Sequence, residues 1–482
     1  MLAENFKYRG LIEYFEKVSS IPRPTFSEEK IAQYICDFAK ERGLFFVKDE
    51  SNNVFVRLPA SKGRENEDGI LLQGHTDMVC EKNAGVEHDF YSDGIELYES
   101  DGFIRAKGTT LGADNGVAVA IMLYILDGAE GNIQSHPTVE CLFTAAEEKG
   151  LVGAGKFDYS VVTAKRMINM DSADEGEIVV GCAGGQRSEL LFSASVEQFK
   201  SPTLKISVKG LFGGHSGEDI NKGRANANKI MGRVLIGLYQ LCKIRVVSIC
   251  GGSKDNAIAR ECEAVVSTDD LDGVYKLCEK LEAEIKQELV SDDCEFCLTV
   301  EPCESKGNVA FNAEDTRKII FLLSTVADGV LKMCEGLESV VEYSRNLGIV
   351  DADAERSSAT FVFLARSAKE TQIAESGAEL DAYAKAFGME HRVVSSYSGW
   401  DRSVDSPLCQ SYSRCYKELF GAECRVNVIH AGLECGIIKK LCPQLDIISC
   451  GPEILDLHSP DETLNIKSFE RFFTVITLML TK

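Results

Sequence analysis

The sequence predicts an α/β protein in which a three-layer catalytic domain is interrupted along the chain by an inserted α+β domain. Short apolar runs of strand length alternate with amphipathic helical segments at both ends of the chain, whereas period-two strands surround longer helices in the middle. Candidate functional residues follow apolar runs in both the first and the last part of the chain. These two parts are therefore expected to fold together, with the middle part inserted between them.

The first part, residues 1–185, alternates helices and strands. Residues 25–28 (Thr-Phe-Ser-Glu) match a helix-capping box, and the apolar residues that follow recur at helical spacing. Strands are expected at 53–58, 70–73, 139–144 and 166–170, and a helix is expected at 115–126. The glycine-rich residues 181–185 break this pattern in the manner of a hinge.

The middle part, residues 186–398, is expected to form a separate α+β domain, large enough for a doubled βαβ-type unit. Its strands are expected at 204–208, 262–267, 295–300 and 360–364, and its helices at 225–241 and 271–289. The first pattern resumes over residues 399–482, with helices at 407–420 and 466–480 and strands at 425–430 and 445–450. The catalytic domain is therefore predicted to be discontinuous.

Composition limits the classes of function. A hydrophobic content of 44% and a charged content of 26% are ordinary for a soluble globular enzyme, and a net charge of −23 disfavours nucleic acid as a partner. No apolar run approaches the ~20 residues that span a bilayer, so no membrane partner is expected. Residues 1–7 lack the features of a signal peptide. The 18 cysteines are spread through the chain, which favours free thiols and the cytoplasm.

Five short segments each hold one or two side chains that bind metals. Each has an ordinary explanation by itself: a His-x-Asp pair is usually on the surface, adjacent glutamates usually lie on a solvated helix face, and aspartates often cap helices or form turns. Most of these segments, however, end apolar runs, and sites in open α/β sheets form at the carboxyl ends of strands. The segments are 73–77 (QGHTD), 110–116 (TLGADNG), 146–148 (AEE), 169–171 (NMD) and 457–460 (LHSP).

Their residue types suit two zinc ions. Zinc prefers imidazole nitrogen and carboxylate oxygen, and two neighbouring cations need a shared anionic ligand. Asp114 is the candidate bridge, because its glycine-flanked turn lets the backbone approach a metal closely. His75 and Asp171 would complete one metal site, and Glu148 and His458 would complete the other.

Two carboxylates remain for other roles. Asp77 lies two residues after His75, so at an extended strand end it points the same way and can orient the imidazole. Glu147 and Glu148 are adjacent and cannot face one metal in the same manner. Glu147 is therefore the candidate general base, which takes a proton from a water whose pKa the metals lower to about 7 and passes it to the departing amine.

Taken together, these motifs resemble the aminoacyl-histidine dipeptidases (peptidase D, or Xaa-His dipeptidases) within the two-zinc, lid-bearing metallopeptidases. The resemblance runs from residues 20–24 (SIPRP) to 458–462 (HSPDE), and its most specific stretches are 106–116, 181–185 and 429–436. It implies a zinc-peptidase fold with a lid, the ligand roles given above, and two Zn²⁺ per chain, which Mn²⁺ or Co²⁺ can replace. It also implies a cis peptide bond between Asp114 and Asn115. One departure is the Gln73-Gly74 pair, where a larger apolar residue often precedes the ligand histidine.

The resemblance also implies roles for three residues of the inserted domain. His215 looks like the lid histidine that reaches the substrate carbonyl oxygen, where it would act as an oxyanion donor. Arg366 resembles the arginine that grips the free carboxylate of a dipeptide, although an arginine that ends an apolar strand can simply extend to solvent. Asn256 resembles a polar partner at the same end.

Two more residues, His430 and Glu434, have ligand-type side chains but bracket a glycine turn. Both interpretations stay open: they are metal ligands, or they only frame a turn whose backbone lines the pocket. The histidines at 88, 136 and 391 are expected at the surface or in turns, and Trp400 is expected to pack where the inserted domain ends.

The implied function is metal-dependent hydrolysis of unblocked dipeptides, including Xaa-His dipeptides such as carnosine, by a water that bridges two zinc ions. The expected partner is a small peptide. Two alternatives remain open: a related two-zinc amidohydrolase (tripeptidase, aminoacylase or desuccinylase), and a catalytically inactive metal-binding relative, against which the retention of Glu147 argues. The sequence leaves open the preferred dipeptide, the metal used in the cell, and whether the protein is a monomer or a homodimer.

Overall fold

The chain forms two compact units in the computed structural model, which describes residues 6–128, 133, 135–305, 307–336, 339–402 and 405–482. The first unit comprises residues 1–182, 400–428 and 433–482, and the second comprises 183–399 and 429–432. The divisions after residues 182 and 399 lie close to the expected boundaries after 185 and 398. Residues 429–432 were expected in the catalytic domain but are grouped with the second unit. Residues 1–5 of the segment considered for a signal peptide lie outside the described residues.

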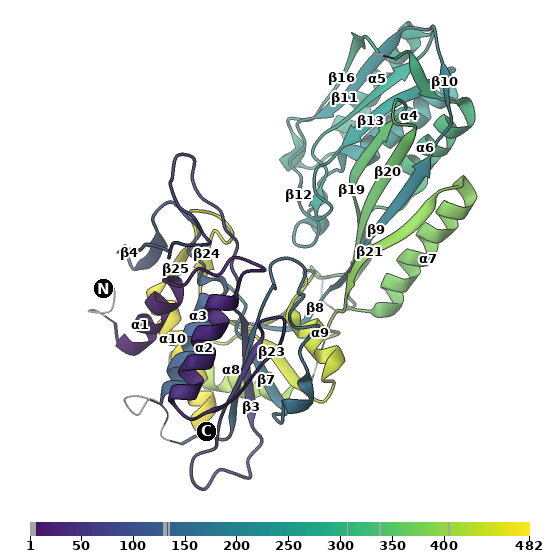
Figure 1. Ribbon diagram of the computed structural model, residues 1–482. Coiled ribbons are helices and arrows are strands. Elements are labelled where there is room, and N and C mark those ends of the chain that lie inside the picture. Colours follow the sequence, from purple (N-terminus) through teal and green to yellow (C-terminus); the bar gives the residue numbers. More distant parts are fainter. Residues whose placement is uncertain (1–5, 129–132, 134, 306, 337–338, 403–404) are drawn as a thin grey trace. The chain divides into compact units, whose positions relative to one another are not determined.

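An eight-stranded sheet forms the centre of the first unit, in the order β1-β2-β6-β3-β7-β23-β8-β22. Four of its strands, β3, β7, β23 and β8, are labelled in Figure 1. Four neighbouring strands are parallel: β6 (Val139–Thr144), β3 (Ile70–His75), β7 (Arg166–Asn169) and β23 (Asp446–Ser449). Their carboxyl ends therefore lie along one edge of the sheet. The other strands are β1 (Phe45–Lys48), β2 (Val54–Leu58), β8 (Glu177–Cys182) and β22 (Arg425–Ile429).

Helices cover both faces of this sheet. Gly74 of β3 faces Ala118 closely, whereas its neighbour Gln73 bonds with Glu434. Because adjacent strand residues point to opposite faces, the helices that carry Ala118 and Glu434 lie on opposite sides, which gives the predicted three layers. The helices of this unit are α1 (Arg9–Ser19), α2 (Glu29–Glu41), α3 (Ala113–Asp127), α8 (Pro407–Phe420), α9 (Glu434–Leu441) and α10 (Ile466–Thr481).

The predicted capping box at residues 25–28 is wrong. Helix α2 begins at Glu29, so Glu28 rather than Thr25 occupies the cap position, and no side chain caps the helix. The Glu28 carboxylate instead accepts hydrogen bonds from the backbone N–H groups of Phe26 and Ala146. It therefore links the start of α2 to the segment after β6. The helix itself buries the expected apolar face, including Ile31, Ile35, Phe38 and Ala39.

A small sheet in the first unit brings two distant segments together. Its order is β24-β25-β5-β4, and β25 pairs with β5. The loop between β24 and β25 contains His458, and the chain after β5 leads to Asp114 at the start of α3. Asp114 and His458, more than 340 positions apart in the sequence, thus lie on segments that are connected to neighbouring strands. The strands are β4 (Leu97–Ser100), β5 (Phe103–Ala106), β24 (Ile454–Leu455) and β25 (Thr463–Asn465).

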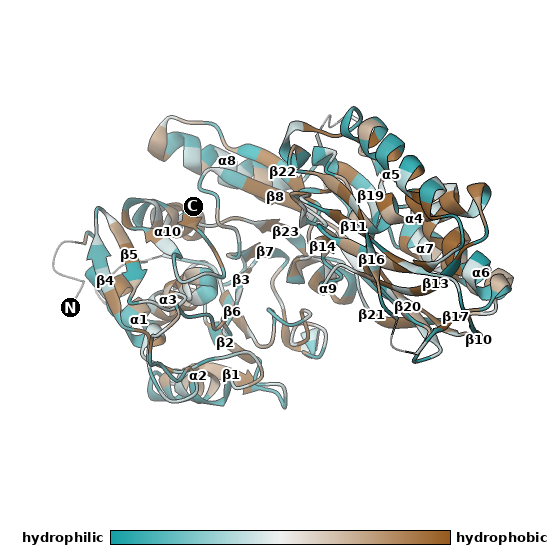
Figure 2. Cartoon of the chain, turned by 90° about the horizontal axis from the view of Figure 1, so that it is seen from above, coloured by the Kyte–Doolittle hydropathy of each residue, from teal (hydrophilic) through white to brown (hydrophobic). Residues whose placement is uncertain are grey.

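The second unit is built on an antiparallel sheet in the order β16-β11-β15-β13-β19-β20-β9-β21, with β18 beside β19. Figure 2 shows hydrophobic residues along many of these strands, which pack with the helices in a second core. The strands are β9 (Gly184–Ser193), β11 (Thr203–Lys209), β13 (Arg245–Gly251), β15 (Cys262–Ser267), β16 (Cys297–Cys303), β18 (Gly329–Met333), β19 (Val341–Asp353), β20 (Ser358–Ser367) and β21 (Glu390–Tyr397).

The connections in this sheet form interlocked βαβ units, in line with the expected doubled βαβ unit. Strands β11 and β13 are joined through α4 and flank β15, while β15 and β16 are joined through α5 and flank β11. The helices are α4 (Ala227–Leu241), α5 (Leu271–Lys286), α6 (Ala313–Thr325) and α7 (Glu370–Phe387). Two short strand pairs complete the unit: β12 (Gly214–His215) with β14 (Ala257–Ile258), and β10 (Val196–Gln198) with β17 (Val309–Phe311).

All the strands and helices expected from the sequence occur, and their ends differ from the expected ends by at most three residues. The cysteines are free thiols, as expected. Two of them, Cys294 and Cys297, have Cys-x-x-Cys spacing, but they belong to none of the possible metal-binding groups among the described residues. No described helix has the length and apolar character needed to cross a membrane.

Of the residues expected at the surface, in turns or in packing, His136 differs from expectation. His88 and His391 are half-buried, whereas His136 is buried just before β6 rather than exposed. Trp400 is buried where the chain re-enters the first unit, and its backbone pairs with Cys182.

Candidate active site and metal centre

The predicted metal ligands of the first unit meet at the carboxyl edge of the parallel strands. His75 is the last residue of β3, Glu148 follows the end of β6, and Asp171 follows the end of β7. Because β6, β3 and β7 are neighbours, these side chains converge. Asp114 reaches the same place from the start of α3, and His458 reaches it from the β24–β25 loop.

The ligand atoms form two overlapping groups around Asp114. Each group lies within 4.8 Å: one joins Asp114 to His75 and Asp171, and the other joins it to Glu148 and His458. Oδ1 of Asp114 is 2.9 Å from Nε2 of His75, and Oδ2 is 3.1 Å from Nε2 of His458. One carboxylate therefore presents a different oxygen to each group, which is the arrangement that a bridging ligand requires.

The donor set fits divalent cations. It combines imidazole nitrogens with carboxylate oxygens, which are the ligands that zinc prefers. Among the described residues, the only ion-pair partners of Asp114, Glu148 and Asp171 are the imidazoles of His75 and His458. In addition, Oε1 of Glu148 is buried without a hydrogen-bond partner. Buried carboxylates at this density are costly unless cations balance them, so the cluster is suited to hold metal ions.

The charges of the cluster shift its pKa values. Burial raises the pKa of Glu147 well above its usual value, and the carboxylates of Asp171 and Glu148 raise it further, against the effect of His75. Hydrogen bonds to Asp114 and Glu148 raise the pKa of His458 to about 11. Burial also acts on His75, where it favours the neutral form, but neighbouring carboxylates outweigh it and raise the pKa. A metal pair would take the place of these imidazole protons, because a ligating histidine is neutral.

Asp77 fixes more of the site than the imidazole alone. The nearest oxygen to Nδ1 of His75 is the backbone carbonyl of Asp77, at 3.1 Å, while the Asp77 carboxylate lies 3.4 Å away. That carboxylate accepts hydrogen bonds from the backbone N–H groups of Glu147 (3.0 Å) and Glu148 (3.2 Å). Asp77 therefore holds the segment that carries both glutamates as well as the histidine.

The two glutamates differ in position. Glu148 lies with Asp114 and His458, and its Oε2 is 3.3 Å from Nε2 of His458. Glu147 lies near His75, with Oε2 4.0 Å from Nε2, and does not join the group around His458. Glu147 belongs to a third possible group, with His75 and Glu148. Glu148 also lies in the group that contains Asp114 and His458, whereas Glu147 shares no group with Asp114, so Glu148 has the better position for a ligand.

Asn115 is a further site residue that the sequence did not single out. Its side-chain amide donates hydrogen bonds to the Met170 carbonyl, at 3.0 Å, and to the carboxylate of Asp171. The Asp114–Asn115 peptide bond is cis, as the resemblance implies. The departure at Gly74 also has a cause here, because a Cβ at that position would lie 2.8 Å from Oδ1 of Asn115. The signals at Asn115 were its position in the 110–116 segment and the cis peptide bond that the resemblance implies.

Neither His430 nor Glu434 belongs to the ligand groups found among the described residues. Glu434 is buried, and its Oε2 accepts hydrogen bonds from Gln73 and Thr144, both at 2.6 Å. Burial raises the pKa of Glu434 to about 7. His430 is grouped with the second unit, where its Nε2 lies 2.7 Å from Oγ of Ser344 and burial lowers its pKa to about 3.

In the second unit, Arg366 and His215 lie side by side. Nη2 of Arg366 is 3.3 Å from Nε2 of His215, and Nη1 donates to the hydroxyl of Tyr397 at 3.0 Å. Nδ1 of His215 accepts the N–H of Glu218, so the neutral ring carries its hydrogen on Nε2. Burial lowers the pKa of His215, and the charge of Arg366 lowers it further. Two neighbouring donors cannot bond to each other, but both can donate to one added oxygen.

This arrangement favours an anion. Arg366 is only 4% exposed, so its side chain does not extend to solvent. Among the described residues it forms no ion pair with a carboxylate; its side-chain partners are Ser216, Tyr397 and His215. A buried guanidinium with neutral partners is suited to receive a carboxylate in a planar, bidentate manner.

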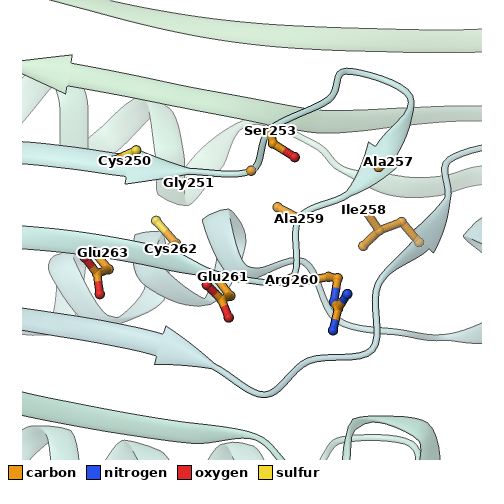
Figure 3. Close-up of a pocket in the computed structure, with 11 residues that line it drawn as sticks. Cys250, Gly251, Ser253, Ala257, Ile258, Ala259, Arg260, Glu261, Cys262 and Glu263 are labelled. Carbon is orange, nitrogen blue, oxygen red and sulfur yellow. The ribbon is translucent and has the colours of Figure 1, made fainter. Parts of the chain in front are cut away.

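Asn256 is exposed in the loop between β13 and β14, and the hydrogen bonds that it forms with other described residues come from its backbone. Its carbonyl accepts the N–H of Ser216 at 2.9 Å. The same loop borders a cavity of about 540 Å³ between β13 and β15 (Figure 3). None of the predicted site residues lines this cavity, which is bordered by Cys250, Ser253, Ile258, Arg260, Glu261 and Glu263 among others.

Known proteins with similar sequences and structures indicate the family. Residues 71–482 match the sequence profile of peptidase family M20/M25/M40. The chain is 36% identical over 479 residues to a protein of Escherichia coli strain K12 named cytosol non-specific dipeptidase, covering 98% of this chain and 96% of the relative. The crystal structure of aminoacylhistidine dipeptidase from Vibrio alginolyticus superposes with a TM-score of 0.90 at 35% identity, covering 100% of this chain and 98% of that one.

A more distant structure shares only the fold. The tripeptidase from Staphylococcus aureus has a TM-score of 0.56 at 15% identity, covering 99% of this chain and 98% of that chain. The family inferred from the motifs and the predicted fold class are both confirmed by these matches. The chain belongs to peptidase family M20/M25/M40.

Proposed function

We propose that this protein is a metal-dependent dipeptidase that acts on unblocked dipeptides, including Xaa-His dipeptides such as carnosine. The observation that carries the proposal is the position of Asp114, whose two carboxylate oxygens lie against His75 and His458 respectively. The substrate class is supported by the names of two relatives that match nearly the whole chain, a dipeptidase and an aminoacylhistidine dipeptidase. The relative named as cytosolic supports a cytoplasmic location.

We assign the two ligand groups to two Zn²⁺ ions, with Asp114 shared between them. His75 and Asp171 complete one set, and Glu148 and His458 complete the other. A nitrogen and oxygen ligand set also accepts Mn²⁺ or Co²⁺. When bound, such a metal pair lowers the pKa of water to about 7 and polarises the scissile carbonyl.

Glu147 is assigned as the general base. It accepts a proton from the attacking water and delivers that proton to the nitrogen of the departing amine. Burial raises the pKa of Glu147 well above its usual value, which makes its carboxylate a stronger base. Asp77 supports this role, because its carboxylate accepts the backbone N–H of Glu147 and so fixes the backbone from which the Glu147 side chain extends.

Two residues of the second unit are assigned to bind oxygen atoms of the substrate. Arg366 receives the free carboxylate of the dipeptide, and His215 donates Nε2–H to the carbonyl oxygen as negative charge develops there. Their adjacent donors and the neutral state of His215 support these roles. Asn256 is a weaker candidate at this end, since its side chain forms no hydrogen bond within the described residues.

A cavity of about 440 Å³ beside Glu148 offers room for a substrate side chain in the first unit. Its walls are mixed, with apolar Met78 and Phe90 and charged Glu81 and Lys149. We propose that these mixed walls accept more than one kind of substrate side chain.

The proposal is tested with purified protein that has been stripped with EDTA and then reloaded. Hydrolysis of carnosine should disappear on stripping and return with Zn²⁺, Mn²⁺ or Co²⁺, reaching its maximum near two equivalents. Cysteine alkylation should inhibit weakly at most, because no thiol belongs to the ligand groups of the described residues. Full activity in metal-free protein would rule out the metal mechanism. Activity on tripeptides or N-acyl amino acids alone would favour the related amidohydrolase.

A further inference from the structure

We propose that Arg23 and Glu462 are positioning residues that hold the turn carrying Asp114 against its partner loops, so that the metal site is formed before metal binds. Both residues lie in stretches that the resemblance marks, 20–24 and 458–462, and neither has a role in the mechanism above. The inference rests on the proposed function, because it assumes that the cluster around Asp114 binds metal.

Arg23 joins two ligand loops through their backbones. Its side chain is only 1% exposed. Nη1 donates to the carbonyls of the two residues that follow His75, each at 3.0 Å, and Nη2 donates to the carbonyl of Gly112 at 2.5 Å. Gly112 lies two residues before Asp114. One planar guanidinium therefore spans the loop of the first imidazole and the turn of the bridging carboxylate.

Glu462 joins the same turn to the second imidazole. Its Oε2 accepts the N–H groups of Leu111 (2.9 Å) and Gly112 (3.0 Å), and its Oε1 accepts the N–H of Asp114 at 3.2 Å. Glu462 lies four residues after His458, in the same β24–β25 loop. Glu462 is only 3% exposed, so these backbone bonds are shielded from water.

The glycines of the turn are explained by this fit. A Cβ on Gly112 would lie 2.5 Å from Nη2 of Arg23, and a Cβ on Gly116 would lie 2.9 Å from the same nitrogen. Gly112 also has a φ of +68°, in the left-handed region that favours glycine. The guanidinium thus packs directly against a turn that has no room for side chains at either position.

The two charges depend on each other. Arg23 binds the carbonyl of Gly112 while Glu462 binds its N–H, so opposite charges meet across one residue of the turn. A buried charge is tolerated only when it is balanced. Burial lowers the pKa of Arg23, and the nearby carboxylate of Glu462 opposes this shift. Neither side chain contacts a ligand atom in these bonds. Both act on Asp114 through the backbone.

The test measures metal affinity rather than activity alone. Arg23→Lys keeps the charge but replaces a fork with a compact ammonium that cannot span both loops. Glu462→Gln keeps the shape but places an NH₂ group against the N–H of Asp114. Each variant should bind Zn²⁺ about 10–100-fold more weakly in competition with a chromophoric chelator. The kcat should fall at limiting zinc and recover substantially when zinc is saturating.

The matched control is Arg345→Lys. Arg345 is fully buried like Arg23, but it lies in the second unit and bonds with the Ala327 carbonyl and the Glu379 carboxylate. Its substitution should lower thermal stability and leave zinc affinity unchanged.

The possible results distinguish failure of the positioning role from failure of the proposed function. If Arg23→Lys and Glu462→Gln lose stability like the control but bind zinc with wild-type affinity, the positioning role is overturned. Circular dichroism checks folding first; if one variant does not fold, the zinc affinity of the other decides. A wild-type protein that binds no divalent metal would overturn the proposed function, and this inference with it.

Discussion

Gly74→Ala tests whether β3 and α3 must approach as closely as the structure shows. Gly74 directly precedes the ligand His75. A Cβ at this position would lie 2.8 Å from Oδ1 of Asn115, and closer still to the Cβ of Ala118. Ordinary contact between carbon atoms needs about 3.5–4.0 Å. The start of α3 would therefore have to move away from β3 by about 1 Å.

This displacement separates two metal ligands. Asp114 lies at the start of α3, and its Oδ1 is 2.9 Å from Nε2 of His75 at the end of β3. A misplacement of about 1 Å can cost about 10²-fold in rate, and overpacking a core costs about 1–3 kcal/mol. Gly74→Ala should therefore lower kcat/KM for carnosine by about 10²-fold at saturating zinc and lower the thermal midpoint.

Gly155→Ala is the control in the same unit. A Cβ on Gly155 would meet its nearest neighbour at 3.6 Å, which is ordinary contact, so this variant should keep wild-type kinetics. Both variants are compared by steady-state kinetics and differential scanning calorimetry. A Gly74→Ala enzyme with the kcat/KM of Gly155→Ala would refute the claim that the close approach sets the ligand geometry.

The other predictions concern single roles. Glu147→Gln should keep both metals yet lose at least about 10³-fold in kcat, whereas Glu148→Gln should lose metal at one site. Mass spectrometry measures the metal content of each variant. If Glu147→Gln lost a metal and Glu148→Gln kept both, the two roles would be exchanged. Arg366→Ala should raise KM and weaken the preference for free over C-terminally amidated dipeptides, and His215→Ala should lower kcat by about 10²–10³-fold with unchanged zinc content. Equal discrimination by wild type and Arg366→Ala would assign the carboxylate to another residue. Glu434 has a pKa raised from 4.5 to about 7 by burial. Its neutral form therefore stabilises the folded, metal-free protein at acid pH, and that contribution of about 3 kcal/mol should be lost as pH rises from about 4.5 through about 7. The free energy of unfolding is measured by urea titration at several pH values. Its decrease between about pH 4.5 and pH 7 should be smaller in metal-free Glu434→Gln than in the metal-free wild type. The same pH dependence in both proteins would show that Glu434 does not titrate in this range.

The strands and the ligands could be predicted because their signals are local. The run at 139–144 is buried along its whole length, and the two glutamates follow its end within four residues. His75 and Asp171 follow apolar runs in the same way. Parallel strands place such ends at one edge, so local patterns were enough to bring these side chains together.

The contacts that hold the ligands in place could not be predicted, because they join distant parts of the chain. Arg23 and Glu462 meet across Gly112, and nothing near either residue indicates this partner. Glu28 was expected to serve a helix cap, but the N–H of Ala146, far along the chain, competes for its carboxylate. Glu434 has the side chain of a metal ligand, and only the fold shows that its carboxylate accepts a hydrogen bond from Gln73 instead.

Contacts between distant parts of the chain also explain why the boundary of the second unit could not be predicted. Residues 429–432 lie within a stretch that reads as catalytic domain, yet the N–H of Ala183 bonds with the carbonyls of Ile429 and Ala431. His430 adds a side-chain contact with Ser344 of β19. Pairing between segments about 250 residues apart decides this assignment, and no local composition marks it.

The central claim, that two metal ions share Asp114, is tested most directly by anomalous diffraction at the zinc edge from crystals of the zinc-loaded protein. We expect two peaks about 3.5–4 Å apart, each about 2.0–2.2 Å from an oxygen of Asp114. One peak should lie beside His75 and Asp171, and the other beside Glu148 and His458. A single peak, or two peaks that do not share Asp114, would contradict the account.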